Sequence, residues 1–334
     1  MQPLISVCIP TFNGERYLHQ CMNSVLQQSY KDIEIIIVDD CSTDSTITLL
    51  EGYCKGDSRI RFLKNASNIG LVSNWNRCIA LASGEWIKFV FQDDYLEVDC
   101  VQKFVEYIEK TNSEVPLLVS KRRFLLDTSF TKIEKEYYEM ELPSLSRIKK
   151  SNFRISAKEI SNASISYISL NFIGEPTTFI FKKSVTEELG FFNEALEQIC
   201  DLEFGLRIAS RYGVVEVPYE LSSFRIHLHS TTNRNIANKY YKLSCLEPVK
   251  LAHQLLFDEA YNSLRKNLNF YYYFKLKVYF YIRGYEAYIK ALKNEANMSE
   301  FQKAEETFPK IKILRRKSLI RRMLYTAILY RRGI

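Results

Sequence analysis

Short apolar runs that end in polar or acidic residues recur through the first third of the chain. Residues 4–9, 33–38, 60–63 and 86–91 have the length and composition of buried strands. The segments between them space their apolar residues as a helix does. Because strands joined by helices favour a parallel, doubly wound sheet, we expect an α/β fold with ligands bound at the carboxyl ends of the strands.

Polar side chains follow three of the predicted strands. Thr11 follows the first, Asp39 and Asp40 follow the second, and Asp93 and Asp94 follow the fourth. These side chains should lie close together, although the sequence separates them. Paired carboxylates suit Mg²⁺ or Mn²⁺, and substrate phosphates often complete the coordination of such an ion. A lone Asp pair would favour a solvated turn or a helix cap, and it is the presence of two acidic strand exits that favours a metal site.

The whole chain is predicted to divide into three parts: the two halves of one domain and a C-terminal extension. A domain spans residues 1–234, with a nucleotide-binding half at 1–110 and a second half at 111–234. The second half contains a polar stretch at 127–175 that we interpret as an insertion covering the site. From residue 235 to residue 334 the pattern is helical, rich in aromatic residues and basic near its end.

The positive charge of the chain is concentrated at its end. The net charge is +7, but residues 310–334 hold nine Lys and Arg and no acidic residue. A uniformly basic, nucleic-acid-binding body is therefore not expected. The stripe Ile320, Met323, Leu324, Ala327 and Ile328 predicts a basic amphipathic helix. Such a helix fits an anionic membrane surface or a docked position on the protein body, and both remain open.

Cysteine usage and hydropathy indicate the compartment. The eight cysteines are scattered without a C-x-x-C pair, so zinc and dithiol chemistry lack support. The first residues show no signal-peptide layout, and no apolar stretch is long enough to span a bilayer. We expect a reducing, cytoplasmic location, with peripheral binding to the inner face of the membrane as an option.

Five blocks, in order, resemble family 2 glycosyltransferases. The blocks are residues 5–13, residues 35–44, residues 68–76, residues 84–94, and Gly174-Glu175-Pro176 together with Asp201 and Arg207. The resemblance implies a GT-A fold, which is a Rossmann-like, mostly parallel sheet flanked by helices, here with a C-terminal helical extension. It also implies a nucleotide-sugar donor, most often a UDP-sugar, and Mn²⁺ or Mg²⁺ as cofactor.

The resemblance assigns roles to residues at each strand exit. Asp201 would be the catalytic base, Asp94 and His227 would hold the metal, and Glu175 and Arg207 would lie on the acceptor side. The residues that would bind the nucleotide-sugar are Pro10, Thr11, Phe12, Glu15, Asp40, Asn76, Asp93 and Arg225. Two positions depart from the family pattern: Cys200 replaces a residue that is usually acidic, and Trp75 replaces one that is often Arg.

The implied reaction moves a sugar to a hydroxyl of a saccharide or lipid-linked saccharide, in the synthesis of cell-surface polysaccharide or glycan. A single base and in-line attack predict inversion at the anomeric carbon. Two alternatives stay open: a phosphoryl-handling enzyme that uses Asp39, and a non-catalytic membrane-surface protein on the same fold. An NAD enzyme is disfavoured, because no G-x-G-x-x-G follows the first strand.

Overall fold

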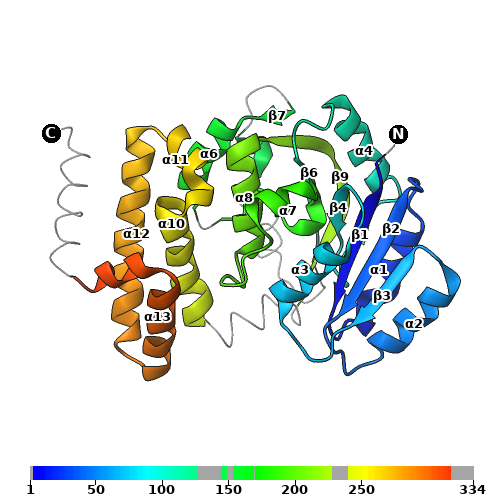
Figure 1. Ribbon diagram of the computed structural model, residues 1–334, viewed down its shortest axis with the longest axis horizontal. Helices are drawn as coiled ribbons and strands as arrows, with labels where there is room; N and C mark the ends of the chain where they lie inside the picture. The colour runs from blue at the N-terminus through cyan, green and yellow to red at the C-terminus, as the bar shows by residue number, and fades with distance from the viewer. Residues whose placement is uncertain (1–2, 127–143, 149–152, 169, 228–239, 317–334) are drawn as a thin grey trace. The chain divides into compact units, whose positions relative to one another are not determined.

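The computed structural model describes residues 3–126, 144–148, 153–168, 170–227 and 240–316. The chain divides into two compact units (Figure 1). The sheet unit comprises Met1–Ser156, Leu170–Ala195 and Cys200–His227, and the helical unit comprises Ala157–Ser169, Leu196–Ile199 and Leu228–Ile334. The predicted domain boundary at residue 234 lies within 228–239, outside the described residues.

The first half of the sheet unit is a parallel sheet. Strands β1 (Ile5–Thr11), β2 (Ile33–Asp39), β3 (Ile60–Lys64) and β4 (Trp86–Phe89) lie in the order β3-β2-β1-β4, and every neighbouring pair is parallel. Helices α1 (Glu15–Leu26), α2 (Thr46–Gly56) and α3 (Leu71–Leu81) connect them. This confirms the predicted α/β class, with a central sheet flanked by helices.

Beyond β4 the sheet is mixed. Strand β8 (Phe179–Lys182) pairs antiparallel with both β4 and β6 (Leu117–Leu126), whereas β6 and β9 (Val214–Ile226) are parallel. Short strands β5 (Tyr95–Leu96) and β7 (Arg154–Ile155) pair antiparallel with β9. Helices α4 (Cys100–Lys110), α7 (Ser184–Leu189) and α8 (Cys200–Tyr212) complete the unit, with short 3₁₀ turns η2 (Leu145–Arg147) and η3 (Pro176–Thr178).

The sequence predicts two strands at residues 214–217 and 221–226, but the structure has the single 13-residue strand β9. The interruption in the pattern is a bulge. Val217 pairs with Ser120 and Glu220 with Lys121, so two residues of β9 are skipped in the register. Pro218 occupies the bulge, where its missing N–H removes no ladder hydrogen bond.

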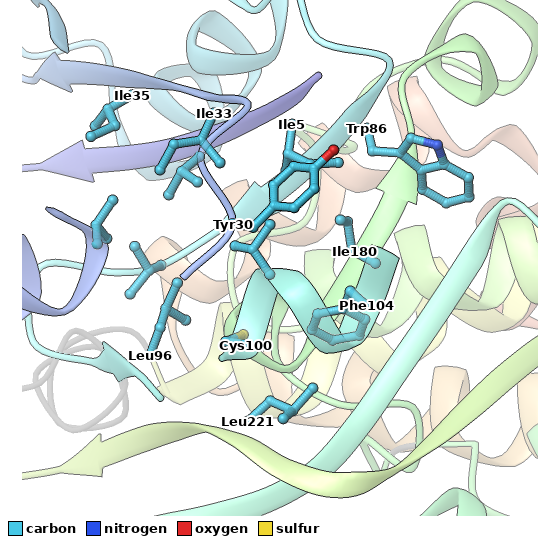
Figure 2. Close-up of a cluster of buried hydrophobic side chains, with 14 of the residues drawn as sticks. Ile5, Tyr30, Ile33, Ile35, Trp86, Leu96, Cys100, Phe104, Ile180 and Leu221 are labelled. Carbon is cyan, nitrogen blue, oxygen red and sulfur yellow. The ribbon is translucent and has the colours of Figure 1, made fainter. Parts of the chain in front are cut away.

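The core explains why β1 and β2 are apolar at nearly every position. Ile5, Val7 and Ile9 of β1 face one way, into a cluster that also holds residues of α1, α2 and α4 (Figure 2). Cys8 points to the opposite face, where α3 packs on β1 and β2. Because helices cover both faces of the sheet, the polar groups of this region collect at the strand ends.

The helical unit confirms the predicted helical C-terminal extension. It contains α6 (Ala157–Ser166), η4 (Tyr241–Leu246), α10 (Glu247–Phe257), η5 (Glu259–Tyr261), α11 (Asn262–Asn267), α12 (Phe270–Ala291), α13 (Glu295–Thr307) and η6 (Pro309–Arg315). None of the described helices has the length and apolar character needed to cross a bilayer. The predicted amphipathic stripe from Ile320 onward lies outside the described residues.

Candidate functional site

The exits of β1 and β2 are joined by hydrogen bonds. The Thr11 hydroxyl donates to Asp39 Oδ2 at 2.9 Å, and the Ser42 hydroxyl donates to the same oxygen at 2.5 Å. Asp39 Oδ1 accepts from the Ser42 N–H at 2.8 Å. Asp39 is 0% exposed, and both its oxygens are occupied. This carboxylate ties two loops together, and its burial disfavours the hypothesis of a phosphorylated aspartate at this position.

Asp40 is also nearly enclosed, with 3% exposure. Its Oδ1 accepts from Asn65 Nδ2 at 2.7 Å and from the Ile69 N–H at 2.8 Å, and its Oδ2 accepts from the Gly70 N–H at 2.9 Å. Gly70 has φ of +91°, a backbone conformation that favours glycine. Asp40 therefore holds the turn before α3 in place, and its predicted contact with the nucleotide-sugar stays a prediction.

The loop after β1 lies beside the exit of β4. The Phe12 N–H donates to Gln92 Oε1 at 2.8 Å, and Gln92 Nε2 donates back to the Phe12 carbonyl at 2.9 Å. Glu15 Oε2 accepts from the Ser45 N–H at 2.9 Å, and Pro10 is buried. The Phe12 side chain is 39% exposed. These contacts join the loops that follow β1, β2 and β4. The closeness of the Asp93–Asp94 pair to Asp39 and Asp40 stays a prediction.

Asp93 and Asp94 have opposite environments. Asp94 is 1% exposed, and its Oδ2 accepts from the Thr177 hydroxyl at 2.5 Å while its Oδ1 accepts from the Arg225 N–H at 2.9 Å. Burial, followed by the charge of Asp93, raises the pKa of Asp94 well above its usual value. The Asp93 carboxylate, by contrast, faces a ring nitrogen: Oδ2 lies 3.1 Å from His227 Nε2.

Arg225 and His227, both near the end of β9, contact the ring of Tyr17. The Arg225 guanidinium stacks 4.4 Å from the centre of the Tyr17 ring, and the His227 ring centre lies 5.2 Å from that of Tyr17. Arg225 Nε donates to the Asp93 carbonyl at 2.9 Å, and its Nη2 donates to Gln20 Oε1 at 2.6 Å. The predicted Arg-x-His element therefore sits directly against Asp93.

Asp201 lies in the first turn of α8 and is partly buried. Its Oδ1 accepts from the Leu202 N–H at 2.7 Å and its Oδ2 accepts from Asn171 Nδ2 at 2.9 Å. Burial, and then the negative charge of Glu175, raise the pKa of Asp201 to about 7. A carboxylate with this pKa suits proton abstraction near neutral pH.

Glu175 connects the two acidic regions. It forms a salt bridge with Arg122 of β6, with a distance of 3.0 Å between Oε2 and Nε. Its charge raises the pKa of Asp94 as well as that of Asp201. Asp94 and Asp201 are therefore both close enough to Glu175 to feel its charge, although 107 positions separate them in the sequence.

Two predicted site residues have structural partners instead. The amide of Asn76 pairs with the Phe192 backbone, donating to its carbonyl at 2.9 Å and accepting from its N–H at 3.0 Å. Arg207 is 6% exposed, bonded to Glu203 and to the carbonyls that end α7, Leu189 and Gly190 among them. These contacts fix loops, and the roles expected for Asn76 on the donor side and Arg207 on the acceptor side stay predictions.

The two departures from the family pattern are buried. Trp75 packs in an aromatic cluster, with its ring centre 4.7 Å from that of Phe91 and 5.3 Å from that of Phe192. Cys200 is 1% exposed, so a carboxylate at this position would be removed from water. Both residues serve packing.

Comparison with known proteins decides the family. The model of the family described as Glycosyl transferase family 2 matches residues 6–188, which is more than half of the chain. The chain belongs to glycosyl transferase family 2. The family-2 chain is 30% identical to the Mycobacterium tuberculosis protein MT1568 over 71% of its own length and 72% of that protein. It is 33% identical to glycosyltransferase GlyG of Streptococcus pneumoniae, over 34% of its own length and 38% of the relative.

Two solved structures share the fold of this family-2 chain. S. aureus TarS 1–349 in complex with UDP-GlcNAc superposes with a TM-score of 0.62 at 18% identity, covering 92% of this chain and 81% of that one. The mannosyltransferase PcManGT from Pyrobaculum calidifontis, in complex with GDP-Man and Mn²⁺, gives a TM-score of 0.57 at 13% identity, covering 94% and 85%. At these identities the likeness concerns the fold alone.

Sequence reasoning missed four residues of the site: Gln92, Arg122, Asn171 and Thr177. Gln92 directly precedes the Asp pair, and Thr177 directly follows the Gly174-Glu175-Pro176 block. These positions next to recognised blocks could have identified both residues as part of the site. Arg122 and Asn171 lie in segments with no recognisable pattern, and their partners are far away in the sequence.

Proposed function

We propose that this family-2 chain transfers a sugar from a nucleotide-sugar, with a UDP-sugar favoured, to a hydroxyl of a saccharide or lipid-linked saccharide. The observation that carries the proposal is Asp201, a half-buried carboxylate whose pKa of about 7 matches the work of a base. Cell-surface polysaccharide or glycan synthesis is the setting we propose. The TarS complex with UDP-GlcNAc, on the same fold, supports a UDP-sugar as the first donor to test.

The donor side is the loop from Pro10 to Glu15 together with Asp40. The exposed Phe12 ring offers an apolar face to a nucleobase, and its backbone is held by Gln92. Asp40 fixes the neighbouring turn through three hydrogen bonds. Rigid support of this kind lowers the entropic cost of binding a nucleotide.

Asp93 and His227 are the residues that would hold a divalent cation, since a carboxylate oxygen and a ring nitrogen lie 3.1 Å apart there. In the described ranges no three His, Cys, Asp or Glu side chains are placed to hold a metal ion together, so Asp93 and His227 would form a partial ligand set. Mg²⁺ and Mn²⁺ accept such a set when the substrate phosphates complete it. We assign Asp93 and His227 as the ligands, because Asp93 Oδ2 faces His227 Nε2. We give Asp94 the supporting role, because it is 1% exposed and binds Thr177 and the Arg225 backbone. When bound, the ion would neutralise charge on the leaving diphosphate.

The protein's own groups perform the remaining steps. Asp201 accepts the proton of the acceptor hydroxyl as that oxygen attacks the anomeric carbon, and the bond to the diphosphate oxygen breaks. In-line attack by one nucleophile inverts the anomeric centre. Arg225, held by Asp93, Gln20 and Tyr17, provides a fixed positive charge beside the diphosphate.

A panel of nucleotide-sugars tests the activity. We expect UDP release from at least one UDP-sugar in the presence of Mn²⁺, and a 10²- to 10⁴-fold lower rate, in round numbers, for Asp201→Asn with unchanged donor binding. Full activity of Asp201→Asn would remove the base assignment. No turnover of any donor by the wild type would contradict the proposed function itself.

Calorimetry with Mn²⁺ and UDP separates the two neighbouring aspartates. Asp93→Asn should abolish the Mn²⁺-dependent part of UDP binding. Asp94→Asn, which keeps one acceptor oxygen, should weaken stability more than it weakens metal binding. The opposite pattern would return the ligand role to Asp94.

We further propose a cytoplasmic location with peripheral attachment to the inner membrane face through residues 310–334. All eight cysteines are free thiols, as a reducing compartment requires. The nine basic residues of 310–334 suit an anionic surface. Sedimentation with phosphatidylglycerol vesicles at low salt, lost when residues 317–334 are deleted, is the expected result, and a chain that stays in the supernatant would contradict attachment.

A further inference from the structure

We infer that Asn171 is a positioning residue that holds the Asp201 carboxylate in the orientation needed for proton transfer, an inference that rests on the proposed function. Asn171 Nδ2 donates to Asp201 Oδ2 at 2.9 Å. The other oxygen, Oδ1, is held by the Leu202 N–H at 2.7 Å. Two donors from separate segments therefore fix both oxygens, which leaves the remaining lone pairs to receive a proton.

The orientation of the Asn171 amide is determined by its partners. Its Oδ1 accepts from the Gly174 N–H at 2.9 Å. Because a backbone N–H can only donate, the amide oxygen must face Gly174, and the NH₂ group must face Asp201. A flipped amide would place oxygen against the carboxylate and lose both hydrogen bonds.

The turn that carries Asn171 is itself fixed. Arg122 donates through Nη2 to the Asn171 carbonyl and through Nε to Glu175 Oε2 at 3.0 Å. Gly174 has φ of +131°, and a Cβ there would lie 2.3 Å from Thr178 Oγ1. The turn from Asn171 to Glu175 is therefore held by one arginine and by a glycine that no other residue replaces without strain.

Asn171 also supports the charged form of Asp201. The charged groups that act on Asp201 are Glu175, which disfavours the carboxylate, and Arg122, which favours it. Burial disfavours the carboxylate most. The Asn171 donor opposes burial and Glu175, since a hydrogen bond to the ionised oxygen stabilises it.

Asn171→Asp is the sharpest test, because it keeps the acceptor for the Gly174 N–H and replaces the donor to Asp201 by a second carboxylate oxygen. The titration of the Asp201 carboxyl is followed by ¹³C NMR in the full chain, with Asp201→Asn assigning the signal. The wild-type midpoint should lie at about 7. Asn171→Ala should raise it by about one pH unit, the scale of one hydrogen bond to a charged group. Asn171→Asp should raise it further, since two facing carboxyls share one proton.

Asn193→Ala is the matched control. Asn193 Oδ1 accepts from the Ala195 N–H at 2.9 Å, so it makes the same kind of turn contact without facing Asp201. It should leave the midpoint unchanged. An unchanged midpoint in both Asn171 variants would overturn the inference, even if those variants lost thermal stability.

Kinetics with UDP-GlcNAc supply the second readout. A one-unit rise lowers the ionised fraction of Asp201 at pH 7 about fivefold, so kcat for UDP release by Asn171→Ala should fall by that factor while KM for the donor stays constant. The loss should shrink as the pH rises. If the wild type releases no UDP from any donor, the proposed function fails, whereas the NMR titration still decides the role of Asn171.

Discussion

Replacing Lys88 by Met should make the stability of the sheet unit less dependent on pH. Lys88 lies on β4 with no exposed surface, and its ammonium donates to the carbonyls of Thr177 and Phe179. Among the described residues, no acidic side chain forms a salt bridge with it. Burial lowers the pKa of Lys88 from 10.5 to about 8. The protonated form of Lys88 therefore destabilises the folded state relative to the unfolded chain, in which the side chain is solvated.

The sign and size follow from linkage. Between the folded and unfolded pKa values the unfolded chain binds the proton more tightly, so the stability of the wild type rises with pH. The full cost, present below the folded pKa, is about 3 kcal/mol, and roughly 2 kcal/mol of it should disappear between about pH 7.5 and about pH 10. Lys88→Met removes the titrating group. The difference in unfolding free energy between wild type and variant should therefore change by roughly 2 kcal/mol over this pH range.

Urea unfolding followed by tryptophan fluorescence measures this difference. The two tryptophans, Trp75 and Trp86, both lie in the sheet unit, and Trp86 is on the same strand as Lys88. The exposed Lys64 of β3, replaced by Met, is the control and should leave the pH dependence as it is. If the difference in unfolding free energy between wild type and Lys88→Met stays constant with pH, the inference that Lys88 is buried as a charged group beside Thr177 is refuted.

Two further changes test the site and the helical unit. The Glu175 charge raises the pKa of Asp201, so Glu175→Gln should lower the pH at which kcat for UDP release is half-maximal on the acidic side, from the wild-type value of about 7. A rise in that pH would contradict the effect of Glu175 on Asp201. Gly284→Ala should destabilise the helical unit by about 1–3 kcal/mol, typical of overpacking, because the added Cβ would lie 2.1 Å from Leu314 Cδ1. Circular dichroism should show this earlier melting without a matching change in tryptophan fluorescence, and an unchanged melting curve would mean that Leu314 moves aside freely.

The fold class could be predicted because it depends on local pattern. An apolar run such as residues 33–38 identifies a buried strand by itself, and the polar residues that follow it mark the strand exit. The convergence of those exits follows from the topology of a parallel sheet. The antiparallel β8 and the bulge in β9 depend on pairings between distant segments, which a single sequence does not contain.

Residue roles were harder to predict than the fold, because a polar side chain near a site can serve the backbone. Asn76 lies in a block that resembles the family, yet both ends of its amide bind the backbone of Phe192. Arg207 similarly holds the end of α7. Neither partner is close in the sequence to the residue that binds it. The same limit hid Asn171, whose contact with Asp201 spans 30 positions.

Asp93 and Asp94 show why adjacent residues of one type can differ in role. Thr177 and Arg225, from two distant segments, enclose Asp94 and occupy both its oxygens, while His227 from β9's end faces Asp93. Burial raises the pKa of Asp94, which means that the ionised form is disfavoured in the folded protein. Hydrogen bonds or a nearby cation would offset this cost. Because Asp94 binds the backbone of Arg225, its position sets the position of the strand that carries His227. Asp94 thus acts through the positions of Asp93, which is partly buried, and His227, which is buried. A substitution at Asp94 should disturb the proposed metal binding by these two residues only to the extent that it moves β9.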